Sequence, residues 1–318
     1  MKARWPGSSC ERRARTVALA ARFLVMATIA AAAGCAAQGA DPAQDAAQPK
    51  GSLLIVGGGP QPDALVKRFV DLAGGAGKAR IVVFAMASED GLQGGEEKAE
   101  DLRKLGAHAV NAYITHEQAD QDSVVQLLDD ATGIWFGGGD QVLLTRALGG
   151  TKVESAIRAR YRDGAVVGGT SAGAAVMSTP MITGDERHPG GDRPDTTDAF
   201  KTIARDNIVT SDGFGLIQGA IVDQHFLRRK RHNRLVSIVL EHPELLGVGI
   251  DESTALLVQP NGEWSVLGAS AVVVYDARGA ATTPPGDGAL GATGIQMHVL
   301  PAGSTFDPRA GKAVLPTR

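Results

Sequence analysis

Short apolar runs alternate with helical patterns along the chain from residue 51 onward, and this alternation constrains the fold more than any other feature. The runs 80–85 and 133–136 are rich in Ile, Val, Phe and Trp and show no polar alternation. Such runs are typical of strands that are buried on both faces, as in a parallel sheet covered by helices. The pattern therefore predicts an α/β domain with a mainly parallel sheet flanked by helices.

The expected elements follow one another in a regular order. Strands are expected at 52–56, 80–85, 109–114, 133–136 and 165–168, and helices at 63–73, 96–105, 123–129, 142–147 and 152–163. Ligands of open parallel sheets gather at the carboxyl ends of the strands. The glycine turns 57–59 and 137–139 fall on that edge, so the functional site is expected there.

After residue 251 the pattern changes to short β segments separated by turns. We expect strands at 254–258, 264–267, 271–275 and 296–300. Strands that are close in sequence commonly pair as antiparallel neighbours. These segments therefore predict a C-terminal antiparallel β extension of the same domain, with a loop-rich stretch at 276–294.

The first fifty residues are expected to lie outside the fold. Residues 1–35 combine a long arginine-rich start with an almost wholly apolar stretch and end in small residues before Cys35, the pattern of an export signal. Ala32-Ala33-Gly34-Cys35 resembles a lipobox, which would make Cys35 the lipidation site and attach the protein to a membrane. Plain secretion and an uncleaved membrane anchor are the alternatives. Residues 36–50 are predicted to form a flexible tether, which leaves 51–318 as a single domain.

Cysteine content and net charge exclude several classes of chemistry. The only cysteines of the chain, Cys10 and Cys35, both lie in the export segment. The mature body therefore has no thiol for a disulfide, a cysteine nucleophile or a cysteine metal site. The formal net charge is −3, which argues against a general nucleic-acid binder.

Ser171 is the candidate nucleophile. It lies in Gly169-Thr170-Ser171-Ala172-Gly173, between an expected strand and an expected helix at 172–178. Gly-x-Ser-x-Gly in this setting is the nucleophile elbow, a sharp turn that small neighbours make possible. The backbone amide of Ala172 would then donate to a developing oxyanion. A purely structural glycine turn is the alternative.

A serine nucleophile needs a base, and the base needs an acid to orient it. Among the seven histidines, His225 stands out because an apolar strand, 220–226, runs into it. For the acid, the short strand 247–252 ends in two carboxylates, which favours Glu252. Glu186, after the nucleophile helix, is the second candidate.

A basic cluster follows His225 directly. It consists of Arg228, Arg229, Lys230, Arg231 and Arg234. Guanidinium groups bind carboxylates in a bidentate manner, so the cluster predicts recognition of a carboxylate beside the catalytic centre, although a solvated helix face is the alternative. In the second glycine turn, the backbone of Gly139 is expected to provide another hydrogen-bond donor to the oxyanion. Gln141, just after this turn, is expected to lie near the substrate.

Three separate motifs together resemble the cyanophycinase family. They are 138–141 (Gly-Gly-Asp-Gln), 168–177 around the candidate nucleophile, and 223–226 (Asp-Gln-His-Phe) followed by Arg229, Arg231 and Arg234. The segment 247–252 is also similar. The resemblance covers roughly 51–275 and is specific as a combination.

The resemblance implies a flavodoxin-like or class I glutamine-amidotransferase-like fold and a serine peptidase of the peptidase E-like group. Such enzymes cleave cyanophycin, a poly-aspartate backbone with arginine on each side-chain carboxyl, to β-Asp-Arg dipeptides. By resemblance Ser171 is the nucleophile and His225 the base. Gln141, Asp223 and the three arginines 229, 231 and 234 belong to the substrate pocket. A homodimer is also implied, and neither a metal nor a cofactor is needed.

Two other functions remain open at this point. One is an aspartyl dipeptidase of the peptidase E type, which shares the elbow but does not need so extended an arginine patch. The other is a catalytically inactive protein that binds acidic peptides. Hydrolysis of the polymer and its loss on substitution of Ser171 separate these three functions.

Overall fold

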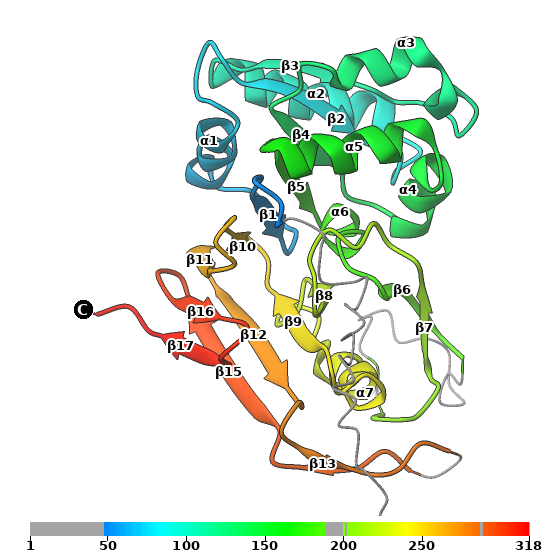
Figure 1. The fold of residues 1–318 in the computed structure, drawn as a ribbon, viewed down its shortest axis with the longest axis vertical. Coiled ribbons are helices and arrows are strands. Elements are labelled where there is room, and N and C mark those ends of the chain that lie inside the picture. Colours follow the sequence, from blue (N-terminus) through cyan, green and yellow to red (C-terminus); the bar gives the residue numbers. More distant parts are fainter. Residues whose placement is uncertain (1–47, 188–199, 201, 287–288, 318) are drawn as a thin grey trace, which may run out of the picture. The chain divides into compact units, whose positions relative to one another are not determined.

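The computed structural model describes residues 48–187, 200, 202–286 and 289–317. The predicted export signal, Cys35 and most of the tether lie outside the described residues. The residues from Ala47 onward form one compact unit, and its secondary structure is shown in Figure 1.

The larger of two main sheets has nine strands in the order β17-β16-β11-β10-β1-β5-β4-β2-β3. Its parallel half consists of β1 (Leu53–Val56), β2 (Arg80–Phe84), β3 (His108–Asn111), β4 (Gly133–Phe136) and β5 (Val166–Thr170). The antiparallel half is β10 (Thr254–Val258), β11 (Trp264–Gly268), β16 (Thr305–Asp307) and β17 (Lys312–Val314). The expected parallel sheet with an antiparallel extension is thus confirmed.

Helices cover both faces of this sheet. On one face α1 (Asp63–Leu72) and α2 (Gly91–Lys104) pack on a core that includes Phe69 and Trp135. On the other face lie α3 (Asp122–Val125), α4 (Gln141–Leu148), α5 (Lys152–Asp163) and α6 (Ala172–Ala175), with short 3-10 turns at Gln118–Asp120 and Gln126–Leu128. Buried β-branched and aromatic side chains hold the layers together because they remove apolar surface from water.

A second sheet, which the sequence did not predict, has four strands in the order β15-β12-β9-β8. They are β8 (Ala220–Gln224), β9 (Leu246–Ile250), β12 (Ala271–Asp276) and β15 (Gln296–Pro301). One face of this sheet shares a core with the first sheet, and its other face packs on α7 (His232–Glu241). The expected antiparallel extension is therefore divided between two sheets.

Smaller differences from the expected elements concern two hairpins and the ends of two helices. The stretch 276–294 was expected to be a loop, but it contains the short pair β13 (Ala281–Thr282) and β14 (Ala292–Thr293). A further hairpin pairs β6 (Met181–Glu186) with β7 (Ile208–Ser211). The second helix begins at Gly91 rather than at residue 96, and the nucleophile helix ends at Ala175 rather than at residue 178.

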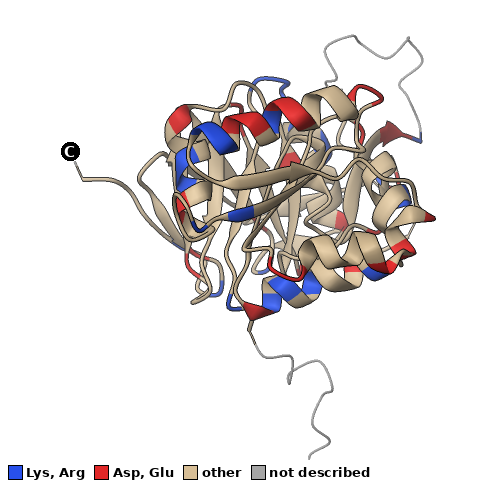
Figure 2. Cartoon of the chain, turned by 90° about the horizontal axis from the view of Figure 1, so that it is seen from above, with Lys and Arg blue, Asp and Glu red and all other residues tan. Residues whose placement is uncertain are grey.

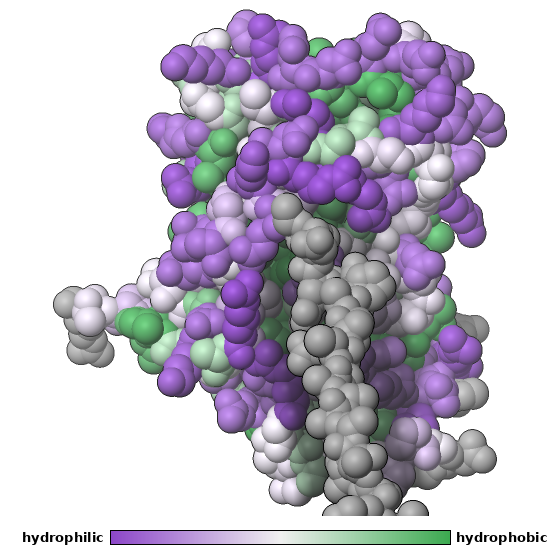
Figure 3. Space-filling model, in the orientation of Figure 1, coloured by the Kyte–Doolittle hydropathy of each residue, from purple (hydrophilic) through white to green (hydrophobic). Residues whose placement is uncertain are grey.

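Charges of both signs are interspersed over the helices in Figure 2, in keeping with the small net charge. The face seen in Figure 3 is mainly hydrophilic over the helices. Among the described residues, no helix combines the length and the apolar character needed to cross a membrane.

Candidate active site

Ser171 lies in a sharp turn between β5 and α6. Its φ is +54°, a left-handed conformation that few residues other than glycine adopt. The turn is possible because Gly169 and Gly173, two residues to either side, have no side chain: a Cβ at Gly169 would lie 2.4 Å from the carbonyl oxygen of Gly173. This is the strained strand-to-helix geometry that the Gly-x-Ser-x-Gly motif predicts.

His225 directly follows β8, in the second sheet, and also has a positive φ, of +49°. Its backbone amide donates to the carbonyl of Gly57 at 2.6 Å. A Cβ at Gly58 would lie 2.3 Å from the imidazole. The glycine turn after β1 thus forms the surface on which the histidine ring rests, a role that the sequence alone did not reveal.

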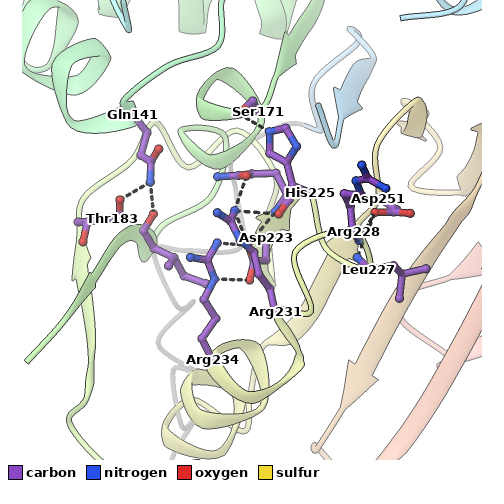
Figure 4. Close-up of polar contacts among 12 residues, drawn as sticks. Gln141, Ser171, Thr183, Asp223, His225, Leu227, Arg228, Arg231, Arg234 and Asp251 are labelled. Atoms are coloured by element: carbon purple, nitrogen blue, oxygen red, sulfur yellow. Dashed lines mark hydrogen bonds and ion pairs between the residues drawn. The ribbon is translucent and has the colours of Figure 1, made fainter. Parts of the chain in front are cut away.

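Ser171, His225 and Glu252 form a hydrogen-bonded chain. His225 Nε2 lies 2.9 Å from Ser171 Oγ, and His225 Nδ1 lies 2.7 Å from Glu252 Oε1. Figure 4 shows the imidazole directed toward Ser171. The second candidate acid, Glu186, accepts instead from the amide of Asn207 at 3.1 Å. The geometry is that of a nucleophile, a base and an orienting acid.

The surroundings of His225 favour the neutral form of its imidazole. Burial lowers the pKa of His225, the hydrogen bond that His225 donates to Glu252 opposes that effect, and the nearby charges of Arg229 and Arg231 lower the pKa further. A general base must be unprotonated to accept a proton. The environment therefore keeps the His225 imidazole unprotonated, and able to act as a base, at a lower pH than is usual for a histidine.

A cavity of about 550 Å³ opens beside Ser171. We refer to it as the arginine cavity because four arginines line it, Arg146 and three from the basic cluster. Its lining includes Gly139, Gln141, Ser171, Thr183, Gln224, Arg229, Arg231 and Arg234. Arg228 and Lys230 are exposed, so the basic cluster divides into a solvated part and a part that lines the cavity.

Asp223 lies beneath the arginine cavity rather than in its lining. Its carboxylate is 1 % exposed and accepts from Nε of Arg234 at 2.7 Å and from a terminal nitrogen of the same guanidinium. Arg231 donates to the backbone and side-chain oxygens of Gln224 at 2.9 and 2.6 Å. The arginines are thus held in fixed orientations, as Figure 4 shows.

Gln141 joins the cavity to the β6–β7 hairpin. Its side-chain amide donates to the carbonyls of Ile182 and Thr183, the first at 2.8 Å. α4 begins at this residue, and its N-cap Asp140 accepts from the amide of Val142 at 2.7 Å. The sequence indicated Gln141 but not Thr183, because β6 has no strand signal strong enough to predict a wall of the cavity.

Asp251 is a further residue at the site that the sequence did not single out. Its Oδ1 accepts from the backbone amides of Leu227 and Arg228 at 3.1 and 2.9 Å, and its Oδ2 accepts from Ser270 Oγ at 2.7 Å. It therefore anchors the loop between His225 and the arginines. Its place beside Glu252 at the end of an apolar strand was the only available signal.

Of the two oxyanion donors expected from the sequence, Ala172 directly follows the nucleophile in the chain. Ala172 is the first residue of α6, and Gly139 lines the arginine cavity together with Ser171. Within the described residues, no group of three or more His, Cys, Asp and Glu side chains is arranged to hold a metal ion.

Comparison with known proteins decides the family. The model of peptidase family S51 matches residues 53–264, a range that includes all three residues of the hydrogen-bonded chain. The chain belongs to peptidase family S51. Family S51 membership agrees with the resemblance drawn from the motifs.

Curated relatives of the chain within this family are cyanophycinases. The chain is 34 % identical over 267 residues to the cyanophycinase of a Nostoc species, with 81 % of this chain and 85 % of the relative covered. It is 31 % identical to the cyanophycinase of Geminocystis herdmanii, with 82 % and 97 % covered. A crystal structure of a peptidase from an acI-B1 Actinobacterium has a similar fold, with a TM-score of 0.60 and 24 % identity over 82 % of this chain and 98 % of that one.

Proposed function

We propose that this family S51 protein is a serine-type exopeptidase that hydrolyses cyanophycin to β-Asp-Arg dipeptides. The observation that carries the proposal is the chain Ser171–His225–Glu252 at the mouth of the arginine cavity. The similarity of this chain to curated cyanophycinases supports cyanophycin as the substrate.

The proposed reaction is acyl transfer. His225 Nε2 takes the proton of Ser171 Oγ while that oxygen attacks the carbonyl carbon of a backbone amide, and Glu252 stabilises the imidazolium that forms. Backbone amides of Ala172 and Gly139 hold the negative oxygen. His225 then gives its proton to the leaving amine, and the C–N bond breaks. Water, activated by the same histidine, hydrolyses the resulting ester and restores the serine.

The arginine cavity supplies substrate recognition in this proposal. Each unit of cyanophycin carries a free arginine carboxylate, and a guanidinium binds a carboxylate through two parallel hydrogen bonds. The basic cluster contributes Arg229, Arg231 and Arg234 to the cavity. Arg146 adds a fourth guanidinium group, and Gln141 also lines the cavity. Asp223 acts through Arg234, whose orientation it sets.

Two other functions are distinguished by direct experiment. An aspartyl dipeptidase would release amino acids from Asp-X dipeptides and leave cyanophycin intact. An inactive binding protein would retain acidic peptides without cleaving them. The ordered hydrogen-bond chain favours catalysis over binding, since a base fixed between a serine and a carboxylate has no use in simple capture.

Incubation with insoluble cyanophycin, followed by mass spectrometry of the soluble products, tests the proposal. We expect β-Asp-Arg from the wild type and none from Ser171→Ala. Turnover of Asp-X dipeptides without release of β-Asp-Arg would contradict the polymer assignment. Activity that survives in Ser171→Ala would contradict the assignment of the nucleophile.

We also propose that the protein is exported, with residues 1–35 as its signal and Cys35 as the lipidated N-terminus of the mature chain. A tethered or secreted enzyme would digest polymer released by other cells. Intact-mass analysis of the mature protein from a native host distinguishes a lipid-modified Cys35 from plain cleavage or an uncleaved anchor. A homodimer, proposed from the family resemblance, is tested by light scattering.

A further inference from the structure

A second cavity lies next to the nucleophile, between α2 and the ends of β2, β4 and β5. It has a volume of about 530 Å³, and we refer to it as the α2 cavity. Gly137 and Gly138 border it, whereas Gly139 borders the arginine cavity. A Cβ at Gly138 would lie 3.4 Å from the Cβ of Ser171. The two cavities therefore flank one glycine turn, with the nucleophile between them.

Lys98 is partly desolvated in the α2 cavity. Its Nζ donates to Gln61 Oε1 at 2.5 Å and lies 4.7 Å from the centroid of the Trp135 ring. Burial lowers the pKa of Lys98 to about 8, and the charge of Asp101 opposes this shift. A cation that has lost part of its water binds an anion more strongly, because less solvent screens the charge.

The lining of the cavity carries both signs of charge. Asp90 and Glu97 lie in it together with Lys98 and the amide of Gln93. A ligand with one carboxylate and one cationic group matches these residues better than a simple anion does. An arginyl unit of cyanophycin has this composition, with a free carboxylate and a guanidinium.

Glycine in α2 gives independent support for a cavity that is kept open. Three glycines weaken the first half of this helix. Gly91 and Gly95 are required by close contacts, since a Cβ would lie 1.9 Å from the carbonyl oxygen of Ala85 or 2.3 Å from Asn111. A Cβ at Gly94 would meet no atom within 4 Å, yet Gly94 lines the cavity one turn from Lys98. Packing therefore does not explain Gly94, but an open cavity does.

We propose that the α2 cavity is a second substrate subsite, in which Lys98 binds the free carboxylate of the arginyl unit on the other side of the scissile bond from the arginine cavity. This inference rests on the proposed function. It assigns one arginyl unit to each cavity, with the amide that joins the two units above Ser171.

The test uses (β-Asp-Arg)₂, which has one scissile bond between two units, and two analogues in which one or the other arginine is replaced by agmatine. Agmatine keeps the guanidinium and lacks the carboxylate. We expect Lys98→Met to reduce kcat/KM for (β-Asp-Arg)₂ at least tenfold. It should also abolish the preference for arginine over agmatine at one of the two units and leave the other preference intact. Lys104→Met, on the exposed side of the same helix, is the control and should change neither.

A second variant tests the cavity without removing a polar group. Gly94→Leu should fold well, because leucine is the better helix former, and it should raise KM for (β-Asp-Arg)₂ by filling the space. If Lys98→Met lowers thermal stability but keeps both preferences, Lys98 serves only to pack on Trp135, and the inference is wrong. If the wild type cleaves none of these peptides and no polymer, the proposed function is wrong as well.

Discussion

The imidazole of His225 rests on the backbone of Gly58, so closely that a Cβ there would lie 2.3 Å from its Cε1. Gly58 has a φ of +112°, and the neighbouring Gly59 makes a similar approach to Glu252. The turn after β1 therefore fixes the position of the base and of the acid without contributing a side chain.

Replacing Gly58 by Ala should displace the imidazole and lower kcat at least tenfold, with a smaller effect on KM. Gly75→Ala is a matched control, because Gly75 also has a positive φ, of +83°, but has no atom within 4 Å of an added Cβ. Both substitutions cost roughly 1 kcal/mol of backbone strain, so an equal loss of kcat in both variants would show that strain, rather than contact with His225, is responsible. Steady-state kinetics on a soluble substrate and denaturant unfolding measure the two effects.

The acid limb of the kcat/KM profile should have its midpoint below 6.5, the ordinary pKa of histidine, because the pKa of His225 is lowered mainly by burial. Arg229→Gln removes a charge that lowers this pKa, so the midpoint should move to higher pH. Arg228→Gln, a neighbouring exposed position, should leave it in place. A midpoint that does not differ among the three proteins would contradict the contribution of Arg229.

The same shift predicts how stability depends on pH. Since the folded pKa of His225 lies below the unfolded value, the folded state favours the neutral ring. This contribution to stability is present above the unfolded pKa and is lost as pH falls below about 6.5 and through the folded pKa. His225→Gln should therefore unfold with a weaker pH dependence than the wild type in that range, as measured by urea denaturation at a series of pH values.

Asp223→Ala should destabilise the protein by about 3–5 kcal/mol, because it leaves the guanidinium of Arg234 buried without its carboxylate. Asp223→Asn keeps a hydrogen-bond acceptor and should cost less. Urea denaturation gives the loss directly. A loss below about 1 kcal/mol for the alanine variant would show that water reaches this pair and that it is worth no more than a surface ion pair.

Asp251→Ala releases two backbone amides in the loop that carries the arginines. It should therefore lower kcat/KM by a factor that, expressed as a free energy, exceeds the loss in the free energy of unfolding. Removing the acceptor of buried donors costs about 1–3 kcal/mol. Ser270→Ala removes only the bond to Oδ2 and serves as the matched control. The prediction would be contradicted if both variants had the kcat/KM of the wild type.

The parallel half of the fold could be predicted because its signals are local. The run 133–136 is a strand with the predicted bounds. The helix predicted at 152–163 also has those bounds, with Thr151 as its N-cap and Gly164 as its C-cap. The second sheet could not be predicted, because a buried apolar run has the same pattern in either sheet. From their sequence pattern, β8 and β9 therefore could not be distinguished from further strands of the first sheet.

The residues of the candidate site could also be predicted where the sequence signal is local, and could not where it depends on contacts between distant segments. Ser171 lies within a motif of five residues, and His225 and Glu252 each end an apolar strand, so sequence position alone indicated all three. The contact of Gly58 with His225 and the hydrogen bond from Leu227 to Asp251 join segments far apart in sequence. No local pattern encodes such contacts. The glycine turn 57–59 could be placed at the functional edge of the sheet, but its contact with His225 and the anchoring role of Asp251 could not be predicted.

Ser171 directly follows β5 of the nine-stranded sheet, whereas His225 directly follows β8 of the four-stranded sheet. Glu252 lies in the connection from β9 of the four-stranded sheet to β10 of the nine-stranded sheet. A folding intermediate in which only one sheet has formed holds a serine without a base. We therefore expect hydrolytic activity to appear only after the two sheets have docked. Recovery of activity during refolding would time the docking of the two sheets, separately from the formation of either one.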